Sequence, residues 1–247
     1  YNYPFTDNVP RPVAELAGPL QRGQRYLAPA FGLPQYAAVA AGLTATASAD
    51  LGGRSRNLLL YVRPTTLRMH ANGYAVPARR ADLQRVISTF TAFYRERLLA
   101  YAASGRYPVN GPVEIRVTGL DHPVGAGAPA LSAVRADGRP AGDVAVWLDL
   151  LTLPDTPDSG DFFREIERFI FAEFPGARPE WSKGWAYTSA GAWTDRSVLT
   201  GTIPAAYRAD QGADRGQGWD EALACLDRCD PYRIFSNPFL DVLTPRP

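Results

Sequence analysis

Hydrophobic residues recur along this chain at two different spacings, and each spacing predicts a different kind of element. In residues 81–103 and 160–174 they recur every three to four positions, which is typical of a helix with one buried face. In residues 112–119 and 143–153 they alternate with other residues, which is typical of a half-buried β-strand. The pattern therefore predicts two long helices and two strands.

Other parts of the chain carry weaker signals. We expect a short helix near residues 12–22, a buried helix over 34–47, a strand over 58–69, a hairpin turn at Asn72 and Gly73, and a short helix over 218–228. Ser159 is expected to cap the second long helix. Residues 120–142 and 175–215 are interpreted as loops, because both are rich in Gly and show little periodicity.

The order strand, helix, strand, strand, helix favours an α+β fold, in which an antiparallel β-sheet is flanked by helices. The chain has 247 residues, of which 46% are hydrophobic, enough for one large domain or two small ones. A net charge of +1 gives no electrostatic case for binding nucleic acid. No apolar run is long enough to span a membrane, and no signal peptide is recognised.

The two cysteines and the first residue carry further information. Cys225 and Cys229 lie four residues apart in an expected helix, a spacing that suits a disulfide poorly and supplies too few ligands for a metal site. The first residue is Tyr1 rather than Met, so we expect the chain to have been cut from a longer protein.

Several kinds of catalytic motif are absent from the sequence. It has no glycine-rich dinucleotide or phosphate loop and no serine nucleophile elbow. Its two histidines, His70 and His122, lack the spacing of metal ligands, and no metal is expected. Serine-triad and zinc chemistry are therefore set aside.

Glu114 and Arg116 share one face of the strand over 112–119, since side chains two apart on a strand point the same way. Two readings stay open for this pair, an ion pair at a sheet edge or part of a functional site. On the strand over 143–153, Trp147 and Asp149 share a face, and Asp149 points either into a pocket or to solvent.

Lys183 stands among the aromatic residues Trp181, Trp185 and Tyr187, in a sequence whose basic residues are almost all arginine. Aromatic rings around one ammonium group can form a cation–π contact. They can equally form the wall of a pocket in which a cation faces an anion.

Longer stretches of the sequence resemble one family. "YPVNGPVEIRVTGLD", "ARPEWSKGWAYT", "DPYRIFSNPFLD" and "LLLYVRPTTLR" are similar to the C-terminal part of the bacterial cholesterol oxidases that carry covalently bound FAD, which are flavoproteins of the vanillyl-alcohol-oxidase type. Sugar-alcohol and aldonolactone oxidases of that superfamily usually have His-Trp-x-Lys where this chain has "EWSK", with Glu180 in the histidine position.

The resemblance implies a chain that works with a partner. It implies that an N-terminal FAD-binding chain of the same enzyme holds the covalent FAD, and that residues 1–205 form the sterol-binding cap while residues 206–247 return to the flavin domain. The implied reaction is oxidation of a sterol 3-hydroxyl by hydride transfer to flavin, with O2 reduced to H2O2. Isomerisation of the Δ5 to the Δ4 ketone is left open.

The resemblance also implies roles for individual residues. Glu114, Arg116 and Lys183 are the expected catalytic residues, with Glu114 as a base or, together with Arg116, as a gate. Expected contacts to the cofactor come from Lys183, Trp181, Arg178 and Asn237, and contacts to the sterol from Trp147, Asp149, Trp185 and Tyr187.

Two alternatives stay open at this point. The chain is a flavin-free sterol-binding module, or it is a relative of the sugar-alcohol and lactone oxidases. A secreted or periplasmic location, with transient membrane contact to collect sterol, is expected from the family alone.

Overall fold

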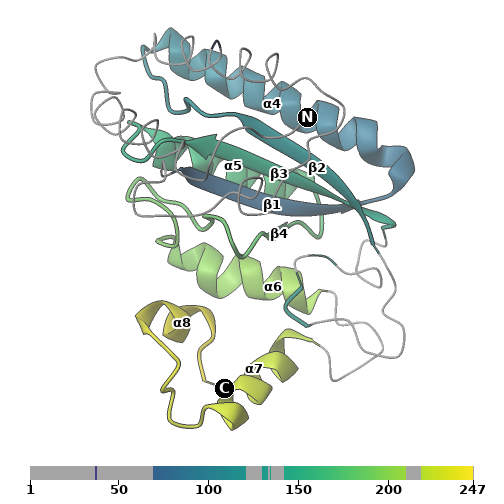
Figure 1. Ribbon diagram of the computed structural model, residues 1–247, viewed down its shortest axis with the longest axis vertical. Coiled ribbons are helices and arrows are strands. Elements are labelled where there is room, and N and C mark those ends of the chain that lie inside the picture. Colours follow the sequence, from purple (N-terminus) through teal and green to yellow (C-terminus); the bar gives the residue numbers. More distant parts are fainter. Residues whose placement is uncertain are drawn as a thin grey trace, which may run out of the picture.

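The computed structural model describes residues 69–120, 130–132, 134, 142–209 and 218–246, together with Ala37. Their centre is a four-stranded antiparallel sheet with the strand order β2-β3-β1-β4 (Figure 1). The strands are β1 (His70–Ala78), β2 (Val113–Gly119), β3 (Val144–Thr152) and β4 (Arg178–Pro179). The predicted α+β fold with an antiparallel sheet and flanking helices is confirmed.

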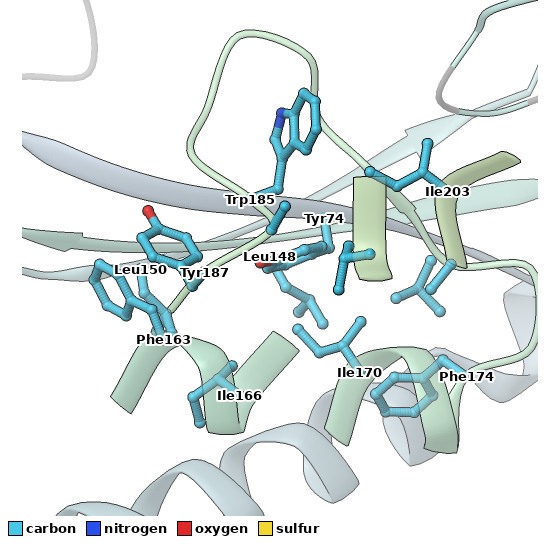
Figure 2. Packing of buried hydrophobic residues seen from close by; sticks show 14 of the residues in the cluster. Tyr74, Leu148, Leu150, Phe163, Ile166, Ile170, Phe174, Trp185, Tyr187 and Ile203 are labelled. Carbon is cyan, nitrogen blue, oxygen red and sulfur yellow. The ribbon is translucent and has the colours of Figure 1, made fainter. Parts of the chain in front are cut away.

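Two long helices pack against the sheet. They are α4 (Leu83–Ala103), which follows the short 3-10 helix η1 (Arg80–Asp82), and α5 (Ser159–Glu173). Tyr74 and Leu148 on the sheet lie beside Ile166 and Ile170 of α5 (Figure 2). Burying each large apolar side chain of this kind stabilises the fold by about 1.5–3 kcal/mol.

Alternation along the strands separates the two faces of the sheet. Val146, Leu148 and Leu150 of β3 belong to the core, as their spacing predicts. Trp147 and Asp149 point to the opposite face, on the side away from α4 and α5. That opposite face carries the polar residues of interest.

The C-terminal part adds smaller elements. The π-helix η2 (Val198–Thr202) runs into α6 (Ile203–Arg208), and two further helices follow, α7 (Trp219–Cys229) and α8 (Pro238–Leu243). In Figure 1, α7 and α8 lie at the opposite end of the molecule from α4. The predicted boundary between residues 205 and 206 falls inside α6, and the division into two domains stays a prediction.

Most expectations with a strong periodic signal are confirmed. The elements expected over 81–103, 112–119, 143–153, 160–174 and 218–228 all form, within two residues of the expected ends. Cys225 and Cys229 are free and exposed on α7. The expected elements at 12–22, 34–47 and 58–69 lie outside the described residues, apart from Ala37, which is helical, and Met69.

Three local expectations were wrong. Asn72 and Gly73 do not form a hairpin turn but lie inside β1, because both pair with β3, opposite Leu150 and Asp149. Ser159 is the first residue of α5, and Asp158, at φ 61°, occupies the cap position. The stretch 175–215 is not all loop, since it contains β4, η2 and α6, and β4 forms by pairing with the distant strand β1.

Candidate functional site

Three carboxyl groups and a glycine form a row across the sheet, on the face opposite the core. Glu114 of β2 pairs with Asp149 of β3, and Asp149 pairs with Gly73 of β1. Glu180, just after β4, donates its backbone N–H to the Gly73 carbonyl over 2.9 Å. The row therefore has one position on or next to each of the four strands. Gly73 is the one member that contributes no side chain.

Arg116 is the cation that holds this row together. Its Nη2 lies 2.7 Å from Asp149 Oδ2 and 3.0 Å from Glu180 Oε2. Its Nε lies 3.1 Å from Glu114 Oε1. The planar guanidinium, with donors on several edges, suits a site where one cation must satisfy several carboxylates. Its carbon also lies 5.8 Å from the centre of the Trp147 ring.

Lys183 brings a second cation to the same carboxylate. Its Nζ lies 3.9 Å from Asp149 Oδ2, and its side chain is 26% exposed. The backbone around it is fixed, because Lys183 N–H donates to the Glu180 carbonyl over 2.9 Å and Gly184 N–H donates to the Ala71 carbonyl over 2.7 Å. Lys183 is also the only lysine in the 247-residue sequence.

Asp149 is the fully buried centre of the cluster. Burial and the nearby Glu180 carboxylate raise the pKa of Asp149 to about 6, against the opposing effect of Lys183 and Arg116. Within the described part of the chain, its Oδ1 has no hydrogen-bond partner. The site thus holds a carboxyl group that changes protonation state near neutral pH, with two cations on its other oxygen.

Residues 1–245 match the family described as cholesterol oxidase, substrate-binding. This chain belongs to that family. A solved structure described as a solvent-stable cholesterol oxidase is 56% identical, with a TM-score of 0.83. The cholesterol oxidase from B. sterolicum is 39% identical, with a TM-score of 0.82. No curated protein matches the chain.

The match covers nearly all of this chain but only part of each solved cholesterol oxidase. Each alignment covers 99% of this chain but 47% of the solved chain. The chain therefore spans about half the length of these relatives, and its part is the one that the family model describes as substrate-binding.

In this substrate-binding chain, five of the residues predicted from the sequence come together. They are Glu114, Arg116, Trp147, Asp149 and Lys183. Asp149 does not point to solvent, because it is fully buried with Arg116 and Lys183 on its Oδ2, and its place in a sterol pocket stays a prediction. The pair on β2 is thus part of a larger charged cluster rather than an isolated ion pair.

The other predicted residues lie around the cluster and do not join it. Trp185 and Tyr187 are buried in the core, and the Trp181 indole N–H donates to the Leu131 carbonyl over 2.7 Å. Arg178 is buried, donates to the Ser132 carbonyl over 2.9 Å and stacks on a tyrosine ring. Asn237 caps α8. Their roles toward cofactor or sterol stay predictions, and His122 lies outside the described residues.

Sequence reasoning missed Glu180 and Gly73 as members of the cluster. In the sequence Glu180 stands out only as a departure from the superfamily motif, and the Asn-Gly pair places Gly73 in a turn. Both are brought in by pairing between strands that are far apart in the sequence. The nearest sequence signal for Glu180 is its position three residues before Lys183.

Proposed function

We propose that this chain is the substrate-binding part of an FAD-dependent cholesterol oxidase, which oxidises the 3β-hydroxyl of a sterol to a ketone while O2 is reduced to H2O2. It acts together with the FAD-binding part of the same enzyme. The observation that carries the proposal is the convergence of Arg116 and Lys183 on Asp149, on the sheet face that α4 and α5 leave uncovered.

The residues of this face fit a flavin. A reduced flavin carries negative charge, and the partly exposed side chain of Lys183 supplies an ammonium group next to the carboxyl row that Arg116 also pairs with. Lys183 is our candidate for the cation beside the ring, with Trp181 at its side and Arg178 and Asn237 as further candidates on the resemblance alone. FAD, when bound, would supply the acceptor for the hydride from the sterol carbinol carbon.

The chain's own residues then have separate tasks. Lys183 places a fixed positive charge where negative charge develops, a contribution typically worth about 3–4 kcal/mol in a dry site. The half-exposed carboxylate of Glu114 forms an ion pair with Arg116. In this position it acts as the base that accepts the proton of the sterol hydroxyl. Alternatively, the Glu114–Arg116 pair opens as a gate for oxygen or substrate.

The remaining expectations belong to the same proposal. A sterol is flat and apolar, so its pocket needs apolar walls with few polar anchors, and Trp147 is the partly exposed aromatic residue beside the cluster. We expect a secreted or periplasmic location from the family alone. Because sterols reside in membranes, we also expect transient membrane contact to collect the substrate. Among the described residues, no helix is long and apolar enough to cross a membrane.

The test is peroxide release from cholesterol by the full-length protein, with a flavin absorption spectrum of the same preparation. We expect a flavin band, cholesterol-dependent H2O2, and a loss of about 100-fold or more in kcat for Lys183→Met. A colourless protein that binds cholesterol without turnover would replace the proposal by a sterol-binding module. Turnover of sugar alcohols or aldonolactones, but not of sterols, would place the chain with those oxidases.

A further inference from the structure

Glu167 is a buried carboxyl group on the core side of the sheet, away from the charged cluster. It lies on α5 and is fully buried. Its Oε2 accepts from the Tyr74 hydroxyl over 2.7 Å and from Ala186 N–H over 2.6 Å, and its Oε1 accepts from Tyr187 N–H over 3.1 Å. A buried carboxylate with three donors is costly to leave unpaired, so these three groups are held tightly.

Two of the donors belong to the loop that begins at Lys183. Ala186 has φ 54°, in the left-handed region that residues with a Cβ rarely adopt. Such a conformation persists only when the surroundings impose it, and the bonds of Glu167 to Ala186 and Tyr187 contribute to this, together with the N–H groups of Thr194 and Asp195, which donate to the Ala186 carbonyl. In the same loop Gly184 lies against the Tyr187 hydroxyl, where a Cβ at residue 184 would overlap it.

The third donor, Tyr74, belongs to the strand that lies beneath Lys183. Tyr74 is the neighbour of Gly73 on β1, and Gly73 lies against the aliphatic part of Lys183, where a Cβ at residue 73 would be 2.6 Å from Lys183 Cγ. Glu167 therefore ties together the strand beneath Lys183 and the loop that follows it. A shift of either support is expected to change the position of the Lys183 ammonium group relative to Asp149.

We propose that Glu167 is a positioning residue that holds Lys183 against Asp149. The inference deepens the proposed function and rests on it for the importance of Lys183. Glu167 touches neither the charged cluster nor its open face, so it acts only through the loop and β1.

The test measures the chemical reactivity of the Lys183 amine in the full-length protein. Lys183 is the only lysine of this chain, so one peptide reports its acetylation by acetic anhydride without ambiguity. In Glu167→Gln the side chain keeps its size but must turn an NH2 group toward a backbone N–H or the Tyr74 hydroxyl. We expect the labelling rate of Lys183 to rise about threefold to tenfold, in protein that is still folded at the assay temperature.

The matched control is Glu165→Gln, a glutamate on the same helix that bonds Arg97 and Tyr101 instead. It should leave the labelling rate of Lys183 unchanged, whatever it does to the melting temperature. An unchanged labelling rate in folded Glu167→Gln would overturn the proposal and leave Glu167 a purely structural residue. Because labelling needs no sterol turnover, this result is separate from any failure of the proposed oxidase activity.

A second variant decides the matter if Glu167→Gln does not fold. Tyr74→Phe removes one donor and introduces no mismatched NH2 group. We expect it to raise the labelling rate of Lys183 about twofold. No change in Tyr74→Phe would count against the proposal.

Discussion

Gly73 lies directly opposite Asp149 in the β1–β3 register, and its missing side chain leaves the space in which Asp149 and Lys183 meet. A Cβ at residue 73 would lie 2.6 Å from Asp149 Oδ1 and 2.6 Å from Lys183 Cγ. Glycine inside a strand weakens the strand and marks a close approach of other groups. Here the approaching groups are a buried carboxyl and the only lysine of the chain.

Gly73→Ala should therefore disturb the cluster from below. The added methyl group forces Asp149 or Lys183 to shift, and we expect a loss of about 1–3 kcal/mol in the free energy of unfolding, with reduced sterol oxidation. Denaturant titration and kcat/KM measure the two effects. Gly119→Ala is the control, because nothing lies within 4 Å of its added Cβ. Equal effects of the two substitutions would contradict the close packing at Gly73.

Asp149→Asn should change stability in a pH-dependent way. The pKa of Asp149 is about 6 in the folded chain and about 3.9 in an unfolded one, so the folded state binds this proton more tightly. The stability that the neutral carboxyl contributes is present below about pH 4 and is lost as the pH rises through about 6. The amide of the variant stays neutral throughout, so the stability of Asp149→Asn relative to wild type should rise by roughly 1–3 kcal/mol between about pH 4 and pH 8.

Urea unfolding of both proteins at the two pH values measures this difference. A stability difference that is the same at both pH values would show that the Asp149 carboxyl titrates as it does in the unfolded chain.

Glu180→Gln should lower the pKa of Asp149. The Glu180 carboxylate is the second cause of the raised pKa after burial, and its removal leaves Arg116 and Lys183 to favour the ionised form. A carboxyl-carbon NMR titration follows Asp149 directly, and we expect a midpoint below the value of about 6 in the wild type. Glu165→Gln, on the far side of the sheet, should leave the midpoint in place. A raised or unchanged midpoint in Glu180→Gln would refute this account of the cluster.

Arg116→Lys should fail to replace the guanidinium. Arg116 reaches Asp149 and Glu180 with one nitrogen and Glu114 with another, which a single ammonium on a flexible stem cannot reproduce. We expect kcat/KM for cholesterol to fall about 100-fold in the full-length protein. Arg97→Lys serves as the control, since Arg97 pairs with Glu165 on the other side of the molecule. Activity near the wild-type level in Arg116→Lys would show that charge alone suffices.

The expectations drawn from local periodicity succeeded because the spacing of the side chains follows the geometry of each element. The apolar stripes of 81–103 and 160–174 belong to single helices, and their spacing reflects helical geometry that is present in the sequence itself. The same holds for the alternation that places Glu114 beside Arg116. The Asn-Gly pair predicts a turn that does not form, because the hydrogen bonds of the β1–β3 ladder outweigh the local preference of that pair.

By itself the sequence determined the helices α4, α5 and α7, the strands β2 and β3, the pairing of Glu114 with Arg116 on one face, and the resemblance that led to the family. Tertiary structure alone decided the register that aligns Glu114, Asp149 and Gly73, and the approach of Glu180 and Lys183 from a segment distant from Glu114 in the sequence. The physical reason is that a strand's faces follow from its own period of two. Which residues meet across strands depends instead on the hydrogen bonds between strands. The sequence of one strand does not indicate which other strand will pair with it, or in which register.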